Sequence, residues 1–363
     1  MIPYILTFLI SLFFFYHADK RRSGKKIFFL ILGILPLVVL AGLRDLTIGT
    51  DTGGYPTGVF MSVISLNSLS RAVNELDFLE PSFVTIAYYV SRISRDVHTF
   101  FFVNQLIIIS GVVWACKRFR VNTCLAMCLY MLAMYNASLN AMRQSMAVPY
   151  CTLSLIFLID KKYIPSILFL VLGYCFHHSA ILYAGILILY WTIDRYKRLR
   201  GRKIFILILI GVTIIYFGYS YILNIMVQIG MESKYVERYG SSDEYGSNVP
   251  ISSIAFNAFN LIYFWYITRG RKIKTEFWYF STMLLLLSLS LCSLAQISTY
   301  AIRITEYFYL MDTLILTYYT MLNRYKNVWM LISFYIFYWV MSYCVANLGD
   351  TMPYSSRIIE TWF

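Results

Sequence analysis

Apolar runs recur along almost the whole chain and alternate with short clusters of Lys and Arg. A helix that crosses a bilayer needs about 20 predominantly apolar residues, so each long run predicts a membrane span. The pattern predicts about twelve such spans, at residues 3–16, 27–43, 99–116, 122–139, 145–159, 164–176, 180–193, 204–223, 252–268, 277–297, 304–322 and 328–346. Several of them require tilting or local thinning of the bilayer. We therefore predict an all-α polytopic membrane protein, a single integral membrane domain over residues 1–363.

The composition excludes an ordinary soluble enzyme. Of the 363 residues, 59% are hydrophobic and 13% are charged, whereas soluble domains are about half apolar and about a quarter charged. The net charge of +13 lies in short connections between apolar runs, which argues against nucleic acid as a partner. The seven cysteines lie within or beside apolar segments and include no CxxC pair. Neither a disulfide framework nor a metal site is predicted from them.

The distribution of basic residues predicts the orientation. Most of them fall in alternate connections, at residues 20–26, 117–120, 161–162, 195–203, 269–274 and 324–326. Because short cytoplasmic loops retain Lys and Arg, both termini are predicted to lie outside. The basic residues left on the outer side are nearly all Arg. Either Lys or Arg can supply the charge that sets the orientation in the membrane, whereas the planar guanidinium of Arg is needed to bind two phosphate oxygens at once. We therefore expect the outer face to bind an anion.

Two outer segments are long. The first, residues 44–98, contains the glycine-rich stretch GTDTGGYP and then EPSFVTIAYYVSRISRD, whose apolar positions recur at helical spacing. We expect an amphipathic helix there, lying on or re-entering the outer surface. The second outer loop, residues 224–250, is rich in Tyr, Glu, Ser and Gly and has the composition of a mobile flap.

Four arginines are candidates for the anion site, because charged groups at or near membrane depth are costly and usually functional. Arg44 ends the second predicted span, Arg143 opens the fifth, Arg303 opens the eleventh, and Arg92 lies on the amphipathic segment. The alternative is that each side chain extends to lipid headgroups. Further polar residues lie within a helical turn of these arginines, namely Asn140, Gln144, Glu306 and Tyr307.

Two kinds of residue are candidates for proton transfer. Asp51 lies in the stretch GTDTGGY, where glycines let the backbone approach a ligand, although an Asx turn is an equally ordinary role for it. His177 and His178 follow the sixth predicted span in FHHSA. Imidazole accepts a proton near neutral pH, which suits a base for a sugar hydroxyl, while an interfacial His bonded to Ser179 or to the backbone is the alternative.

Five motifs in order resemble the EpsG-like, Wzy-type bacterial polysaccharide polymerases: GLRD…IGTDTGGY, EPSF, NAMRQSMA, FHHSA and RITEYF. The positions that match the family pattern are Arg44, Asp51, Tyr55, Glu80, Asn140, Arg143, Gln144, His177, Ser179, Arg303 and Tyr307. His178 falls on a variable position of that pattern. The resemblance therefore favours His177 over His178 as the functional histidine.

The resemblance implies a membrane glycosyltransferase of the GT-C type at the outer face of the bacterial inner membrane. It would join undecaprenyl-pyrophosphate-linked oligosaccharide repeats, as donor and acceptor, into O-antigen or a similar surface polysaccharide. Arg44, Arg143 and Arg303 would hold pyrophosphate, and His177 or, in competition, Asp51 would activate the acceptor hydroxyl. The other substrate-binding candidates are Tyr55, Glu80, Arg92, Asn140, Gln144, Ser179 and Tyr307. No cofactor and no metal are expected, and a polysaccharide chain-length regulator is the expected protein partner.

Two rival functions share this substrate. An O-antigen ligase would use the same donor but transfer the glycan to lipid A core. A flippase for lipid-linked oligosaccharides would need arginines for pyrophosphate and charge through the membrane depth. The inward half of the predicted spans holds little charge, with Asp312 as the main exception. We therefore expect a polymerase.

Overall fold

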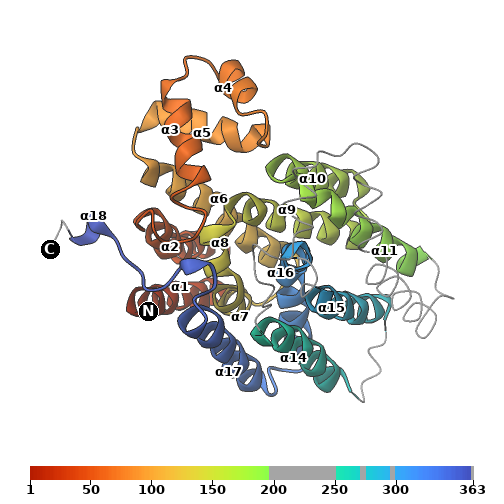
Figure 1. Ribbon diagram of the computed structural model, residues 1–363. Coiled ribbons are helices and arrows are strands. Elements are labelled where there is room, and N and C mark those ends of the chain that lie inside the picture. Colours follow the sequence, from red (N-terminus) through yellow and green to blue (C-terminus); the bar gives the residue numbers. More distant parts are fainter. Residues whose placement is uncertain (196–250, 270–274, 295–298, 361–363) are drawn as a thin grey trace. The chain divides into compact units, whose positions relative to one another are not determined.

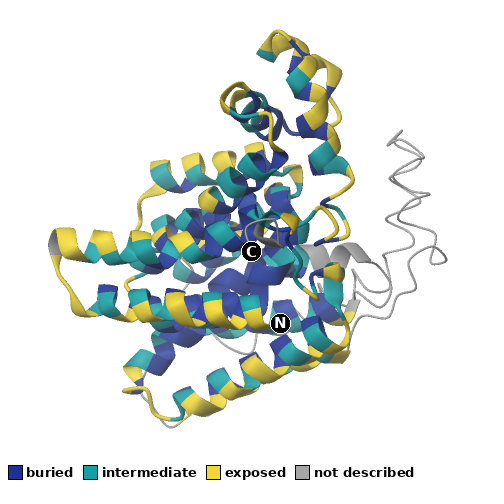
Figure 2. Ribbon diagram, turned by 90° about the vertical axis from the view of Figure 1, so that its left-hand side faces the viewer, coloured by how far each residue is buried: buried dark blue, intermediate teal, exposed yellow. Residues whose placement is uncertain are grey.

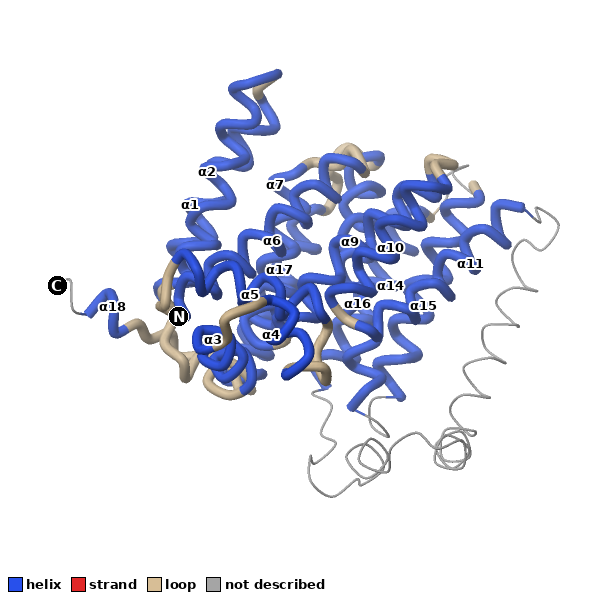
Figure 3. The backbone as a smooth tube through the Cα atoms, turned by 90° about the horizontal axis from the view of Figure 1, so that it is seen from above, coloured by secondary structure: helices blue, strands red, loops and turns tan. Residues whose placement is uncertain are grey.

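The computed structural model describes residues 1–195, 251–269, 275–294 and 299–360. Its regular elements in these ranges are all helices (Figure 3). Six helices of the described part are long and apolar enough to cross a membrane: Ile2–Lys20, Gly24–Gly42, Val97–Arg118, Met142–Ile159, Glu276–Ser293 and Val328–Val345. The prediction of a polytopic α-helical membrane protein is therefore confirmed, whereas the predicted number of spans is not. The predicted span at 204–223 and the loop at 224–250 lie outside the described residues.

The chain divides into two compact units, Met1–Tyr183 with Arg324–Phe363, and Ala184–Asn323. In the first unit, α1 (Ile2–Lys20) and α2 (Ser23–Gly42) pack against each other, and α2 also packs on α6 (Val97–Arg118) (Figure 1). Next, α9 (Met142–Ile159) packs on both α6 and α10 (Tyr163–Phe176). A side chain at Gly111 of α6 would come within 2.9 Å of Pro149 of α9, so this glycine permits the close helix contact.

Two predicted spans of the first unit contain a π-helical turn. The span predicted at 122–139 consists of α7 (Thr123–Tyr130), the π turn η1 (Met131–Tyr135) and α8 (Asn136–Asn140). The Asn122 side chain begins it by accepting a hydrogen bond from the backbone of Leu125 at 2.8 Å. The span predicted at 328–346 consists of α17 (Val328–Trp339) and the π turn η4 (Val340–Val345).

Many large apolar side chains on the outer faces of these helices are exposed (Figure 2), among them Leu6, Leu9, Ile27 and Phe28 of α1 and α2. Such a face suits hydrocarbon and not water. The two ends of the helices differ in charge. At one end of the first unit, the basic connections at residues 20–26 and 117–120 are neighbours, since Lys117 lies beside Lys26, and Arg118 forms an ion pair with Asp160. The connections at the other end carry the candidate site residues of this unit.

At that other end, residues 44–98 contain three helices, α3 (Tyr55–Ser65), α4 (Leu69–Glu75) and α5 (Pro81–Ile93). The helix α5 lies within the segment predicted to be amphipathic, and its buried face, which includes Phe83 and Ala87, packs on α3. Phe83 also meets Phe100 of α6 at a ring-centroid distance of 5.3 Å. Aromatic contacts therefore fasten residues 44–98 to α6.

The second unit contains α11 (Tyr183–Arg195), α14 (Ile251–Thr268), α15 (Glu276–Leu294) and α16 (Thr299–Leu322). Helices α14, α15 and α16 pack against one another pairwise. Their apolar contacts include the edge-to-face pair Phe264–Tyr319 at 5.0 Å. Polar residues are buried in the same bundle, among them Asn257, Asn260 and Asp312.

Candidate functional site

Four of the predicted site residues meet in one hydrogen-bonded network in the first unit. Arg143, near the start of α9, donates from Nη1 to Glu80 Oε2 at 2.5 Å and from Nε to the Tyr55 hydroxyl at 3.1 Å. The other carboxylate oxygen of Glu80 lies 2.7 Å from His177 Nδ1 and accepts the backbone N–H of His178 at 3.1 Å. The Glu80 carboxylate thus joins Arg143 to His177, and Tyr55 is attached to the network through Arg143.

Local structure explains why these side chains converge. Glu80 immediately precedes α5, whose first residue is Pro81, a residue suited to a helix start because its missing N–H would have no helical partner. His177 follows α10 and has an extended backbone (φ −157°, ψ 123°), so the chain leaves the helix axis at this residue. The Ser82 hydroxyl donates to the carbonyl of Cys175, which ties the start of α5 to the end of α10.

Glu80 is the buried centre of the network. Its side chain is 4% exposed, against 24% for Arg143 and 22% for His177. Burial alone would raise the pKa of Glu80, but the hydrogen bond from His177 and the charge of Arg143 outweigh it and lower the pKa to about 2. The carboxylate is therefore ionised at neutral pH. Burial also raises the pKa of Tyr55, so this phenol stays neutral beside Arg143.

The arrangement can perform general base chemistry at His177. The ionised Glu80 accepts a hydrogen bond only, so His177 Nδ1 carries the proton in this contact and Nε2 is left as the basic atom. Among the described residues, Nε2 has no hydrogen-bond partner, and the ring is partly exposed. His178 differs, because its exposed ring lies beside Tyr174 at 5.0 Å and only its backbone reaches Glu80.

Asn140 organises the loop that carries Asp51. The Asn140 Oδ1 atom accepts hydrogen bonds from the backbone of Asp51 at 2.8 Å and from the hydroxyl of Thr50 at 3.0 Å. Gly49 has a φ of +97°, a backbone conformation that glycine adopts readily and other residues rarely adopt. The Asp51 carboxylate is half-buried and makes no hydrogen bond or ion pair within the described residues. An Asx turn is therefore not what holds this side chain.

A C-terminal segment, residues 347–357, completes that loop, and the sequence analysis did not identify it. The backbone N–H groups of Gly49 and Thr50 donate to the carbonyls of Asp350 and Gly349 at 2.9 and 3.1 Å. The backbone of Arg357 donates to the Asp45 carboxylate at 2.8 Å. The signal that was available is the polar run after the last apolar segment, which contains Asn, Gly, Asp and Pro.

Arg44 lies beneath the loop and is 1% exposed. Its guanidinium donates to the carbonyls of Ala41 at 2.5 Å and Leu139 at 3.1 Å and lies over the Phe101 ring at 4.4 Å. Burial lowers the pKa of Arg44 to about 10, which still leaves it charged at neutral pH. In this conformation the side chain is enclosed by protein and joins the end of α2 to the end of α8, whose Leu139 carbonyl also accepts the hydroxyl of Thr52 in the loop at 3.3 Å.

Five further candidates were predicted, and their positions differ. Arg92 donates to the carbonyls of Val63 at 2.6 Å and Ile64 at 3.3 Å, at the end of α3. Gln144 is buried next to Arg143, and Ser179 is half-buried two residues after His177. Tyr307 is buried in α16 of the second unit. The side chain of Arg303 lies outside the described part of the chain.

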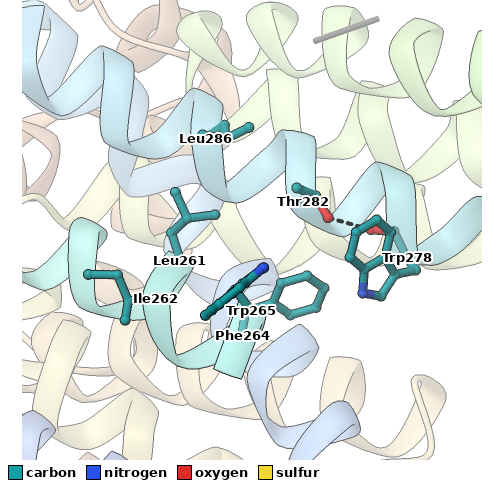
Figure 4. Close-up of a pocket in the computed structure, with 7 residues that line it drawn as sticks. All are labelled: Leu261, Ile262, Phe264, Trp265, Trp278, Thr282 and Leu286. Carbon is teal, nitrogen blue, oxygen red and sulfur yellow. Dashed lines mark hydrogen bonds between the residues drawn. The ribbon is translucent and has the colours of Figure 1, made fainter. Parts of the chain in front are cut away.

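Two further features of the described residues bear on the location of the site. They include no group of three or more His, Cys, Asp or Glu arranged to hold a metal ion. A cavity of about 290 Å³ lies between α14 and α15 and is lined by apolar side chains with Thr282 (Figure 4). The Thr282 hydroxyl donates to the carbonyl of Trp278 at 2.9 Å. None of the lining residues is charged, so the cavity offers no charged group for catalysis.

The fold and the network define a polytopic membrane protein with an acid–base pair in the connections at one end of its helices. The chain belongs to the EpsG family, whose sequence profile matches residues 26–356 and so confirms the resemblance drawn from the motifs. It is also similar to the amylovoran biosynthesis protein AmsC of Erwinia amylovora, with 22% identity over 182 residues. That alignment covers 47% of this chain and 48% of the Erwinia protein, about half of each. No solved structure matches the chain.

Proposed function

We propose that this protein is a membrane glycosyltransferase that joins oligosaccharide repeat units, carried on undecaprenyl pyrophosphate, into a surface polysaccharide. Membership of the EpsG family supports this, as does the similarity to a protein named for amylovoran biosynthesis. The observation that carries the proposal is the contact between the buried Glu80 carboxylate and Nδ1 of His177. It prepares a base in the partly exposed connections at one end of the helices, where a lipid-linked sugar can approach.

In the proposed reaction, His177 Nε2 takes the proton of the acceptor hydroxyl. The oxygen of that hydroxyl forms a bond to the anomeric carbon of the donor sugar. The bond from this carbon to the pyrophosphate oxygen breaks, and the electron pair leaves with undecaprenyl pyrophosphate. Glu80 holds the tautomer of His177 and stabilises the imidazolium that forms. Asp51 is the competing base, because its carboxylate is half-buried without a partner among the described residues.

We assign the departing negative charge to Arg143. Its Nε and Nη1 are engaged by Tyr55 and Glu80, and Nη2 makes no hydrogen bond within the described residues. A guanidinium held in this way can meet a phosphate oxygen without reorganising, which is how preset charge favours a transition state. The enclosed Arg44 acts in the proposal by fixing the loop that carries Asp51, and Arg303 is the proposed second pyrophosphate ligand.

The proposal places the site at the outer face of the bacterial inner membrane, with both termini on that side. It needs no metal, because the arginines neutralise the leaving group. Gln144, Asn140, Ser179, Arg92 and Tyr307 are proposed to position the sugars or the elements that hold them. A chain-length regulator is proposed as the protein partner.

The test is polymerisation by the purified full-length protein in detergent. The protein is incubated with its cognate lipid-pyrophosphate repeat unit and a chelator, and the products are separated on a gel. We expect a ladder of multiples of the repeat. An unchanged single band from folded protein would refute polymerisation and favour a flippase or a ligase.

The neighbouring histidines provide a matched pair of variants for the base. We expect His177→Ala to give no ladder and His178→Ala to give a normal one, because only the His177 ring contacts Glu80. Normal ladders from both variants would exclude His177 as the base and leave Asp51. Thermal unfolding of both proteins checks that the loss is not a loss of folding.

A further inference from the structure

Asp312 is a fully buried carboxylate that the proposed reaction does not use. It lies in the middle of α16 and is 1% exposed. The hydroxyl of Ser288, on α15, donates to Asp312 Oδ2 at 2.8 Å, while Oδ1 has no hydrogen-bond partner among the described residues. A charged group inside a membrane protein is costly unless it is compensated, so Asp312 requires a partner.

The helices α14 and α15, which pack on α16, contain no Lys or Arg that could be this partner. The segments at 251–268, 276–294 and 304–322 contain neither residue. Arg303 precedes Asp312 by nine residues, which is about 13 Å along a helix. The charge of the carboxylate is therefore not balanced by a basic side chain of α14 or α15, the helices that pack on α16.

Two asparagines of α14 lie at the level of Asp312. Asn257 Nδ2 donates to the Tyr309 hydroxyl at 3.2 Å, and further along both helices the hydroxyl of Tyr263 is 3.2 Å from Thr320 Oγ1. Both contacts advance in the same direction, so α14 and α16 run parallel. Asn260 and Asp312 each follow the first contact by three residues, on the same helix faces. Both residues therefore lie about one helical turn beyond the Asn257–Tyr309 contact, at a similar level of the bundle.

The amide groups of these asparagines are also incompletely bonded. Asn257 and Asn260 are each 1% exposed. Within the part of the chain that the structure describes, Asn257 Oδ1 and both polar atoms of Asn260 have no hydrogen-bond partner. Buried polar atoms are nearly always hydrogen-bonded, and an exception is energetically costly. Three such oxygen atoms, on residues 257, 260 and 312, therefore indicate a common ligand.

We propose that Asp312, Asn257 and Asn260 form a binding site for a monovalent cation such as Na⁺ inside the bundle of α14, α15 and α16. Carboxylate and amide oxygens are the ligands that hard cations prefer. One carboxylate balances one positive charge, and the described residues offer no acidic cluster for a divalent ion. A proton on Asp312 would remove its charge but leave the oxygens of Asn257 and Asn260 without partners. A cation serves all three.

The test is the thermal stability of the purified full-length protein at constant ionic strength in sodium, potassium and choline chloride. A ligand that binds only the folded state raises the melting temperature with its concentration. We expect a saturable rise of a few degrees in sodium or potassium that is absent in choline, together with stoichiometric binding of radioactive sodium. Equal melting temperatures in all three salts would overturn the proposal.

Variants locate the site. Asp312→Asn keeps an acceptor for Ser288 but removes the charge, so we expect it to lose the cation response and the bound sodium. Asp77→Asn, at an exposed position outside the bundle, should respond as the wild type does. Should Asp312→Asn fail to fold, Asn260→Ala serves, with an expected loss of affinity of at least tenfold. A full response in these variants, or stabilisation by acid alone without a cation effect, would overturn the proposal.

Discussion

Replacing Glu80 by Gln tests the centre of the candidate site. The side chain keeps its shape and loses the charge that binds Arg143 and orients His177. The pKa of Glu80 is lowered from 4.5 to about 2, and a shift of this size corresponds to about 3 kcal/mol of stabilisation of the ionised form. A loss of folding free energy of similar size is measured when one partner of a buried ion pair is removed.

The effect on catalysis should exceed the effect on folding. An amide can present its NH₂ group to Nδ1, which would put the proton of His177 on Nε2 and remove the base. General base catalysis contributes about 10²- to 10⁴-fold, so we expect Glu80→Gln to lower kcat by that factor. The assay is the rate of ladder formation by purified protein, accompanied by a melting curve.

Glu75→Gln is the matched control, because Glu75 makes the same kind of ion pair, with Arg71, but is 47% exposed. Exposed pairs contribute at most about 1 kcal/mol, so this variant should polymerise and melt as the wild type does. Wild-type rates from Glu80→Gln would refute the positioning role of the carboxylate. Equal losses in both variants would show that the segment at residues 44–98 as a whole, and not this contact, governs the rate.

Three further predictions concern neighbouring contacts. Arg143→Lys removes the planar fork that contacts Glu80 and Tyr55 together, so we expect a loss of at least tenfold in ladder formation, with normal amounts of protein in the membrane. Arg44→Ala removes a buried guanidinium, leaves the Leu139 carbonyl without this donor and should lower stability by about 2–4 kcal/mol, measured by chemical unfolding. Because the pKa of Glu80 is lowered, the ionised carboxylate stabilises the folded protein fully above pH 4.5, and this contribution is lost as the pH falls towards 2. We therefore expect the melting temperature of the wild type to fall between these pH values by an increment that Glu80→Gln does not lose. A parallel decline in both proteins, full activity of Arg143→Lys or unchanged stability of Arg44→Ala would contradict the respective prediction.

Hydropathy was sufficient to predict the class of fold and the approximate position of most helices. The number of spans was not predictable in the same way. The helices α14 and α16 were expected to cross the membrane but are not among the six helices of the described part that are long and apolar enough. Both carry buried polar residues, such as Asn260 and Asp312, whose role depends on neighbours in other helices. A hydropathy average over a segment does not show which of its polar residues are buried against other helices.

The candidate site shows a similar division. The motifs selected Tyr55, Glu80, Arg143 and His177 as separate candidates, and the structure joins them. Glu80 is 63 residues from Arg143 and 97 from His177, and no helical or strand period relates such separations. Sequence reasoning also placed Glu80 among the groups that contact substrate. Its burial between two side chains is a property of tertiary packing, and it is this burial that suggests a positioning role.

The C-terminal segment has a consequence for how the protein is made. The backbone of Arg357 bonds to Asp45, which precedes it by 312 residues. A ribosome therefore releases the loop around Asp51 long before it supplies the carbonyls of residues 349 and 350 that hold this loop. Contacts of such high sequence separation close late, because the entropy of a long loop must be lost first. The nascent chain thus inserts its early helices before the loop around Asp51 can be completed, and this loop closes only once residues 349 and 350 have been synthesised.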